Sequence, residues 1–374
     1  MTDSIKTIGI LGGGQLGMML AQAALKLGHR CVFLEDADGV PAALYGQVFK
    51  YNELDDFITA SDVFTLEFEN TPIKTAKSLA SLEHKGSLFP PTNALEIAQD
   101  RLAEKVLFNR LNIDTVPFMA VNSLDELQTA TNKLGLPLVL KTSRGGYDGK
   151  GQFVIKTQSD IATAWEELGD AVTGDGGLTD APAPLIAEGF IHFSREVSII
   201  AVRSQNGDIC YYPLVENHHT NGILSKTIAP AANADHLTEQ AQSNISKILS
   251  HLDYVGVLTL ELFVSDDGLI ANEIAPRVHN SGHWTIEGAN TSQFENHIRA
   301  VLGLPLGDTG IIKPSVMLNV IGKYPDVSEL LTHTGVHFHH YHKAERDGRK
   351  IGHITVMSDD NDGVVTNITQ LLTS

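Results

Sequence analysis

The chain has 374 residues, of which 42% are hydrophobic and 19% charged, a globular composition that excludes disordered, collagen-like and coiled-coil classes. Its 27 basic residues against 45 acidic ones give a net charge of −18, which argues against nucleic acid as a partner unless a local basic patch overcomes the repulsion. Two cysteines without a CxxC partner disfavour a thiolate metal site and a disulfide scaffold, and they fit a reducing cytosol. No apolar stretch approaches the ~20 residues of a membrane span. We therefore expect a soluble, unprocessed cytoplasmic protein with no membrane partner.

The first hundred residues alternate between patterns typical of strands and of helices, which predicts an α/β domain. The predicted elements are a strand over 6–11, a glycine loop over 12–17, an apolar helix that Gly28 ends, a strand over 31–34, a strand over 63–68 and a helix over 71–82.

The first glycine loop, GGGQLG, has the spacing of a dinucleotide-binding fingerprint. Acidic residues, Glu35 and Asp36, follow about twenty positions later, as that fingerprint requires. Backbone N–H groups at the start of the following helix are suited to hold a phosphate. A tight packing turn explains the loop equally well, so the motif alone leaves both interpretations open.

A second, α+β unit follows Pro90-Pro91. Residues 93–111 predict one helix with Leu95, Ala98, Leu102 and Val106 on its buried face and Thr92 as its N-cap. Further elements are predicted as a strand over 136–142, a glycine loop over 143–152, a strand over 153–156, a helix over 160–168, a mobile surface loop over 169–184, and a C-terminal β-rich segment with strands over 315–322, 336–342 and 351–358.

The second glycine loop has four glycines in seven positions, with Lys150 inside it and Lys141 on the preceding strand. Backbone amides of such a loop can close over a polyphosphate, and the lysines supply compensating charge. A glycine-rich flap over ATP is the favoured interpretation, and a flexible hairpin with solvated charges is the alternative. The loop lacks the G-K-[ST] ending of a Walker A motif, which disfavours the P-loop fold.

Two apolar strand patterns carry Glu261 and Glu273 on either side of Asp266-Asp267-Gly268. A three-residue loop with Gly268 in the left-handed position places the two glutamates directly opposite each other. Because like charges facing across a ladder destabilise a sheet, this pairing predicts a divalent cation, with magnesium and nucleotide phosphates as the natural occupants. A two-residue turn instead shifts the register by one and moves a glutamate to the solvent edge.

Donor-rich segments follow. The loop over 272–283 contains an arginine, two histidines, an asparagine and a serine, which suits bicarbonate or a phosphate ester. Strand alternation separates His337 and His339 from His340 and His342, so structural or surface roles are favoured over a metal site. The cations at 343, 346, 349 and 350 are equally consistent with a solvated turn and a phosphate clamp.

Taken together, GGGQLG, EFEN, DRLAEK, GYDGKGQ, EGFI, ENHH and NEIAPRVHNSGHW resemble the ATP-grasp carboxylases of purine synthesis, and most closely the 5-(carboxyamino)imidazole ribonucleotide synthetases, from residue 7 to residue 353. The resemblance implies an ATP-grasp fold, α/β plus α+β. It divides the chain into an N-terminal Rossmann-like pre-ATP-grasp domain (1–98), an ATP-grasp domain (99–300, with a flap subdomain at about 114–188) and a small β-rich C-terminal domain (301–374).

The activity implied by this resemblance is that of a carbon–nitrogen ligase. It joins bicarbonate to the exocyclic amine of 5-aminoimidazole ribonucleotide through carboxyphosphate, converts ATP to ADP and phosphate, and serves IMP synthesis. Bicarbonate is a poor electrophile, and phosphorylation in a closed site activates it. Magnesium as a cofactor and a homodimer are also implied.

The same resemblance assigns residues to the site. ATP is assigned to Arg101, Lys141, Gly146, Tyr147, Asp148, Gly149, Lys150, Gly151, Gln152, Glu188, Gly189, Phe190, Ile191, Glu196, His219, Asn272 and Glu273. Magnesium is assigned to Glu261 and Glu273. The ribonucleotide and bicarbonate are assigned to Gly14, Gln15, Leu16, Glu69, Tyr147, Arg277, His279, Asn280, Ser281, Lys343 and Arg349. Catalytic roles fall to Asp148, which would handle the amine proton, and to Arg277 and His279.

Three further expectations come from the resemblance. The first glycine loop faces the imidazole substrate, so we expect no dinucleotide there. His218 and His219 are adjacent, so either one could be the histidine that contacts ATP, and we choose His219 from its spacing to Glu196. The stretch from Gly174 to Pro184 resembles an insertion.

Rival functions are another ATP-grasp ligase, such as formate-dependent glycinamide ribonucleotide transformylase or a biotin carboxylase, an NAD-dependent oxidoreductase that uses the first glycine loop, and a non-catalytic nucleotide sensor. Substrate-dependent ADP release separates these classes.

Overall fold

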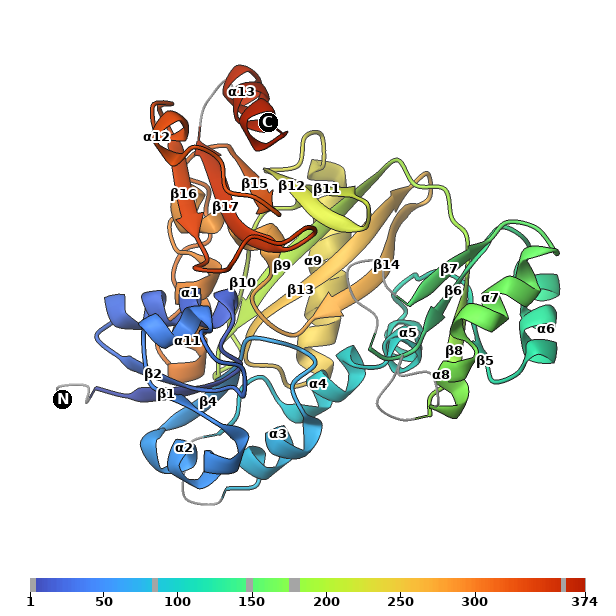
Figure 1. The fold of residues 1–374 in the computed structure, drawn as a ribbon, viewed down its shortest axis with the longest axis horizontal. Helices are drawn as coiled ribbons and strands as arrows, with labels where there is room; N and C mark the ends of the chain where they lie inside the picture. The colour runs from blue at the N-terminus through green and yellow to red at the C-terminus, as the bar shows by residue number, and fades with distance from the viewer. Residues whose placement is uncertain (1–4, 83–86, 146–150, 175–181, 358–360, 374) are drawn as a thin grey trace.

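The computed structural model describes residues 5–82, 87–145, 151–174, 182–357 and 361–373 and contains three β-sheets. We call them the N-terminal sheet, the flap sheet and the central sheet. Figure 1 shows the central sheet through the middle of the molecule, with the N-terminal sheet at one end and the flap sheet at the other. Figure 1 also shows the last strands of the chain beside the N-terminal elements.

The N-terminal sheet is parallel, with strand order β3-β2-β1-β4. Its strands β1 and β4 are almost fully buried, as expected for parallel strands covered on both faces. This confirms the α/β prediction. The elements are β1 (Thr7–Leu11), α1 (Gln15–Lys26), β2 (Arg30–Leu34), η1 (Pro41–Leu44), β3 (Val48–Phe49), η2 (Tyr51–Glu53), α2 (Leu54–Ala60), β4 (Val63–Leu66) and α3 (Ile73–Ala80).

The predicted helix over 93–111 is wrong, because the chain forms two helices there, α4 (Thr92–Ala98) and α5 (Arg101–Arg110). Asp100 interrupts the run and caps α5, accepting the N–H groups of its first turn. Thr92 lies inside α4, with Pro91 at the N-cap position. The buried face of α5 differs too: Val106 is 57% exposed, whereas Glu104 and Lys105 are buried.

The flap sheet is antiparallel, with strand order β5-β8-β6-β7 and a hydrophobic core of its own. The predicted helix over 160–168 is confirmed. The expected loop over 169–184 is wrong at its start, where α8 forms, and 175–181 lie outside the described residues, as do 146–150 of the glycine loop. The elements are β5 (Phe118–Val121), α6 (Leu124–Leu134), β6 (Leu138–Thr142), β7 (Gln152–Ile155), α7 (Asp160–Leu168), α8 (Asp170–Thr173) and β8 (Leu185–Gly189).

The central sheet is antiparallel, with strand order β14-β13-β9-β11-β12-β15-β17-β16 and β10 paired to β9. Its first elements are β9 (Arg195–Arg203), β10 (Ile209–Tyr211), β11 (Val215–Thr220), β12 (Ile223–Ala229), α9 (Asp235–His251), β13 (Gly256–Ser265) and β14 (Gly268–Ala275). The remaining elements are η3 (Asn280–Gly282), α10 (Thr285–Gly288), α11 (Gln293–Leu302), β15 (Ser315–Ile321), α12 (Val327–Leu330), β16 (Val336–His340), β17 (Lys350–Met357) and α13 (Asn361–Thr373).

The three predicted C-terminal strands are confirmed, but they do not form a separate sheet. Strand β15 pairs with β12, so the C-terminal strands extend the sheet begun by β9 to β14. One hydrophobic core also joins the N-terminal unit to the central sheet: α1 packs on α11, and Met18 and Leu20 belong to the same cluster as Trp284 and Phe294. Shared packing therefore fixes the first glycine loop relative to the donor-rich loop after β14.

Candidate active site

The predicted pairing of Glu261 with Glu273 across β13 and β14 is confirmed, although the predicted turn is wrong. Ser265 pairs with Gly268, so the turn has two residues rather than three. That register alone would misalign the glutamates, but a bulge between Ala271 and Glu273 adds one residue and restores the pairing. The extra residue is Asn272.

Helix α5 holds this bulge from the side. Strand β14 is at the edge of the central sheet, so its outward backbone groups need partners from outside the sheet. Lys105 Nζ donates to the carbonyl of Asn272 at 2.6 Å, and the N–H of Ile274 donates to Glu104 Oε1, also at 2.6 Å. The two adjacent charged residues of α5 thus bind the backbone on both sides of Glu273 and fix the direction of its side chain.

The two facing glutamates are in different electrostatic states. Burial and the neighbouring charge of Glu261 raise the pKa of Glu273 above its usual value. Burial alone would raise the pKa of Glu261 as well, but His279, whose Nε2 lies 3.0 Å from Glu261 Oε1, holds the pKa below its usual value. A divalent cation would relieve the repulsion between these facing carboxylates, so the pair fits a magnesium ion.

Within the described residues no third acidic, histidine or cysteine side chain completes a protein-only metal cage. Magnesium bound with a nucleotide commonly takes only one or two carboxylates from the protein, and phosphate oxygens and water fill its other positions. The two glutamates therefore match the mode of binding predicted for a nucleotide metal.

Buried charges link α5 to the flap sheet. Glu188 Oε2 lies 2.6 Å from Lys141 Nζ, and Glu188 Oε1 lies 3.6 Å from Lys105 Nζ. Burial would raise the pKa of Glu188, but these two lysines keep it below its usual value. Arg101 at the start of α5 donates to the carbonyl of Thr142 at 3.0 Å. Four residues thus surround the junction of the two sheets. Arg101, Lys141 and Glu188 were predicted to bind ATP, and Lys105 was not predicted.

Five more of the residues predicted for ATP lie at or beside the ends of strands β7 and β8. Gly151 (φ +71°) and Gln152 lead into β7, Gly189 ends β8, and Phe190 is 48% exposed beside Ile191. The predicted residues Gly146, Tyr147, Asp148, Gly149 and Lys150 lie outside the described residues.

The two adjacent histidines of β11 have different partners because a bulge separates them. His219 Nδ1 lies 2.8 Å from Glu196 Oε2, whereas His218 Nε2 lies 3.0 Å from Glu216 Oε1. Burial would lower the pKa of His219, but its hydrogen bond with Glu196 raises the pKa above the usual value. The structure therefore pairs Glu196 with His219, the histidine chosen by spacing.

Two of the residues predicted for the substrate, Arg277 and Glu69, form a bidentate ion pair. Arg277 Nε donates to Glu69 Oε2, and Arg277 Nη2 donates to Glu69 Oε1 at 2.8 Å. Burial would raise the pKa of Glu69, but Arg277 keeps it below the usual value. Nearby, His279 Nδ1 shares a hydrogen bond of 2.8 Å with Ser281 Oγ. This pairing orients the ring, and His279 Nε2 then faces Glu261.

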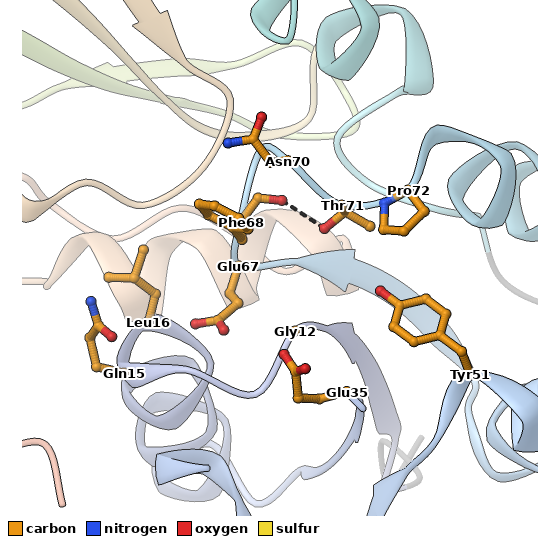
Figure 2. A pocket seen from close by; sticks show the side chains of 10 residues that line it. All are labelled: Gly12, Gln15, Leu16, Glu35, Tyr51, Glu67, Phe68, Asn70, Thr71 and Pro72. Carbon is orange, nitrogen blue, oxygen red and sulfur yellow. Dashed lines mark hydrogen bonds between the residues drawn. The ribbon is translucent and has the colours of Figure 1, made fainter. Parts of the chain in front are cut away.

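The first glycine loop meets the C-terminal cations. Gln15 Oε1 accepts a hydrogen bond from Lys343 Nζ, although the two residues are separated by 328 positions. Burial and the nearby charge of Arg349 lower the pKa of Lys343 to about 8. Leu16 is buried, and a cavity of about 250 Å³ opens beside the loop, lined by Gln15, Leu16 and Glu67 among others (Figure 2).

Asn280 exchanges hydrogen bonds with Asn319 of β15, at 3.1 and 2.7 Å, and Arg349 donates to the carbonyl of Ala344 at 3.3 Å. The described residues predicted for the substrate therefore come from four parts of the chain: the first glycine loop, the segment after β4, the loop after β14 and the C-terminal cations.

Three site residues were missed by the sequence analysis: Glu67, Glu104 and Lys105. Glu104 precedes the buried Leu107 and Phe108 by three and four positions, which is the spacing of one helical face. The spacing would have indicated Glu104 if the prediction had included charged residues on the buried face of the helix. Glu67 follows a fully buried strand, at the edge where parallel strands commonly carry functional side chains.

A central antiparallel sheet with paired glutamates, linked through helix α5 and its Lys105–Glu188 ion pair to a small sheet with its own glycine loop, defines an ATP-grasp enzyme, and the ATP-grasp domain family matches residues 106–294. The ribonucleotide synthetase preATP-grasp domain matches residues 5–99, and the phosphoribosylaminoimidazole carboxylase C-terminal domain matches residues 315–366. The chain belongs to the family of N5-carboxyaminoimidazole ribonucleotide synthases, a carbon–nitrogen ligase family.

Relatives match over nearly their whole length. The N5-carboxyaminoimidazole ribonucleotide synthase of Pseudomonas aeruginosa is 45% identical over 358 residues, covering 94% of this chain and 95% of the relative. The synthetase from Thermus thermophilus has a TM-score of 0.90 and 44% identity, covering 98% of this chain and 99% of that one. The synthase from Aspergillus clavatus in complex with ADP and 5-aminoimidazole ribonucleotide has a TM-score of 0.86 and 32% identity, covering 99% and 98%.

These matches do not favour the transformylase, biotin carboxylase, oxidoreductase or sensor alternatives. Among the helices in the described part of the chain, none has the length and apolar character needed to cross a membrane.

Proposed function

We propose that this chain carboxylates 5-aminoimidazole ribonucleotide with bicarbonate to give N5-carboxyaminoimidazole ribonucleotide, with ATP converted to ADP and phosphate, in purine synthesis. The observation that carries the proposal is the pairing of Glu261 and Glu273 within reach of His279. The Arg277–Glu69 ion pair and the Gln15–Lys343 contact add binding groups for an anionic ribonucleotide.

The reaction has two steps. A bicarbonate oxygen attacks the γ-phosphorus of ATP, the bond from that phosphorus to the β-phosphate bridging oxygen breaks, and ADP leaves. In the carboxyphosphate formed, the carbon–oxygen bond to phosphate then breaks, CO₂ passes to the exocyclic amine, and phosphate leaves while the nitrogen loses a proton. A closed site is needed because carboxyphosphate reacts with water.

The residues divide between these steps. We assign the nucleotide to Arg101, Lys141, Glu188, Glu196, His219 and the second glycine loop, and magnesium to Glu261 and Glu273. When bound, magnesium neutralises charge on the transferring phosphoryl group. Lys141 and Arg101 are cations at this junction, and they suit the same electrostatic task.

On the substrate side, we assign the ribonucleotide phosphate to Lys343 and Arg349, and we assign Arg277 and His279 to the ribonucleotide and bicarbonate. The fork of Arg277 is already oriented by Glu69, so binding requires little side-chain ordering. We assign removal of the amine proton to Asp148. We also propose a cytoplasmic homodimer and retain the division at residues 98 and 300, with the C-terminal strands contributing to the same sheet. A monomer mass by light scattering would count against the dimer.

The activity is tested by measuring ADP release with ATP and magnesium while 5-aminoimidazole ribonucleotide and bicarbonate are each present or omitted. We expect turnover only with both, and label from bicarbonate in an acid-labile product. Glycinamide ribonucleotide with formate serves as the rival pair, and turnover with that pair alone would overturn the substrate assignment.

The metal assignment is tested by Glu273→Gln, which keeps the size of the side chain and removes its charge. We expect loss of turnover from a folded protein, because one of two carboxylate ligands is gone. Glu239→Gln is the matched control, since Glu239 is exposed on α9. Normal ADP release by the Glu273 variant would refute the assignment.

A further inference from the structure

The backbone N–H groups of the first glycine loop bind a carboxylate from the same protein, that of Glu67. Glu67 lies directly after β4 and is 6% exposed. Its Oε1 accepts the N–H of Gly14, and its Oε2 accepts the N–H of Gly17 at 2.6 Å. Figure 2 shows the Glu67 side chain reaching from the segment after β4 towards the glycine loop and α1.

These N–H groups are the ones that a dinucleotide fingerprint presents to phosphate. The N-terminus of a helix carries unpaired donors and a partial positive charge, and both favour an anion. Gly14 occupies the N-cap position of α1 without a side-chain cap. The Glu67 carboxylate therefore binds the end of α1 in the place of a phosphate, which explains physically why a loop with this spacing need not take a dinucleotide.

The loop is also shaped around this side chain. A Cβ atom added at Gly12 would lie 2.6 Å from Glu67 Cγ, and one added at Gly14 would lie 2.7 Å from Glu67 Oε1. Gly12 further has φ +103°, which other residues rarely adopt. Two glycines of the motif are thus required by the buried glutamate.

The loop held by Glu67 carries Gln15 towards the substrate side. Gln15 begins α1 and accepts a hydrogen bond from Lys343, and Glu67 lies near enough to Lys343 for their charges to interact. Burial raises the pKa of Glu67, whereas the two N–H donors and Lys343 favour its ionised form. Both carboxylate oxygens accept hydrogen bonds, which is the arrangement that the ionised form makes.

We propose that Glu67 is a positioning residue for 5-aminoimidazole ribonucleotide: as an internal anion it holds the Gly12–Gly17 loop so that Gln15 meets Lys343 at the ribonucleotide site. This inference rests on the proposed carboxylase activity. It assigns no contact between Glu67 and the substrate, and Glu67 acts through the loop.

The test compares Glu67→Gln and Glu67→Ala with the native protein. The amide of Gln presents a donor to N–H groups that need an acceptor, and Ala leaves a gap that a small carboxylate can fill. Glu35→Gln is the matched control, because Glu35 lines the same cavity without bonding the loop. The native protein is assayed first, so failure of the carboxylase assignment would be seen there, before any variant is compared.

We expect both Glu67 variants to raise KM for the ribonucleotide about tenfold, because a tenfold change corresponds to the loss of about one charged hydrogen bond. KM for ATP should change less than twofold. Acetate should lower the KM of Glu67→Ala for the ribonucleotide most of the way back to the native value, and it should have no effect on Glu35→Gln. Because Glu67 acts through Gln15, Glu67→Gln should add little in a Gln15→Ala background.

An unchanged KM for the ribonucleotide in both Glu67 variants would overturn the proposal. So would an equal rise in both KM values that acetate does not reverse, because that is the result of a damaged core. If neither Glu67 variant yields folded protein, Glu67→Asp decides, since it keeps the charge but shortens the reach to the N–H groups of Gly14 and Gly17. That variant should show the same selective rise, and a native KM for the ribonucleotide would refute the proposal.

Discussion

Lys105→Met tests whether helix α5 sets the geometry of the predicted magnesium site. Lys105 is 1% exposed, donates to the carbonyl of Asn272 at 2.6 Å, and lies 3.6 Å from Glu188. Methionine is shorter by one atom, and it removes the donor and the charge. The bulge that carries Glu273 then loses its support on one side, so the two glutamates should no longer be held opposite each other.

The expected size of the effect follows from these contacts. Removing one partner of a buried ion pair costs about 3–5 kcal/mol, and leaving a buried carbonyl without a donor costs about 1–3 kcal/mol. Lys141 remains 2.6 Å from Glu188 and still compensates its charge, which removes much of the ion-pair cost, so we expect a total loss of stability of about 2–4 kcal/mol. Displacing Glu273 should also weaken magnesium binding about tenfold, which is about 1.4 kcal/mol.

The assay combines urea unfolding with ADP release over a magnesium titration. The expected result is a higher magnesium requirement with an unchanged KM for the ribonucleotide. Lys247→Met is the matched control, because Lys247 also donates to a backbone carbonyl, at 3.2 Å, but at the surface. We expect it to change stability by less than about 0.5 kcal/mol. A Lys105 variant that loses stability but keeps the native magnesium dependence would refute the role in positioning Glu273.

Three other predictions test separate parts of the site. Burial raises the pKa of Glu104 to about 8 from 4.5, so between these values unfolding releases a proton and stability falls as pH rises; Glu104→Gln should remove that slope in urea unfolding from pH 5 to 8, and an unchanged slope would contradict the shift. Arg277→Lys loses the fork that grips Glu69 and should lower kcat/KM for the ribonucleotide about tenfold or more, and native kinetics would exclude this role. His219→Ala should raise KM for ATP whereas His218→Ala should not, and the reverse order would move the assignment by one residue.

The glutamate pair shows how far the sequence could predict this site. Alternation along two strands was enough to place Glu261 and Glu273 on one face, but the turn between the strands was predicted with three residues and has two. The pairing survives because of the bulge at Asn272, and that bulge is supported by Lys105, which lies 167 positions earlier. A register that depends on so distant a contact cannot be deduced from the residues near the turn.

The helix over 93–111 fails for a related reason. Its apolar residues suit a continuous helix with Val106 inside, yet Asp100 accepts two backbone N–H groups and starts a new helix. The new helix presents Glu104 and Lys105 to the interior, because the edge of β14 supplies backbone partners for both. Hydrophobic periodicity assumes that charged side chains face water, and this assumption fails where a sheet edge needs a donor and an acceptor.

The residues missed by the sequence analysis share one property. Glu67, Glu104 and Lys105 are all buried, and each bonds to backbone groups of a segment that carries a predicted binding residue. Motifs are dominated by residues expected to meet the ligand, so they led to Gln15 and Glu273 but not to the buried polar side chains that hold them. A buried polar side chain that bonds to backbone donors or acceptors is costly to leave unpaired, and it therefore fixes the local chain conformation. In this chain, the geometry of the site depends on these buried polar contacts as much as on the residues predicted to meet the ligands.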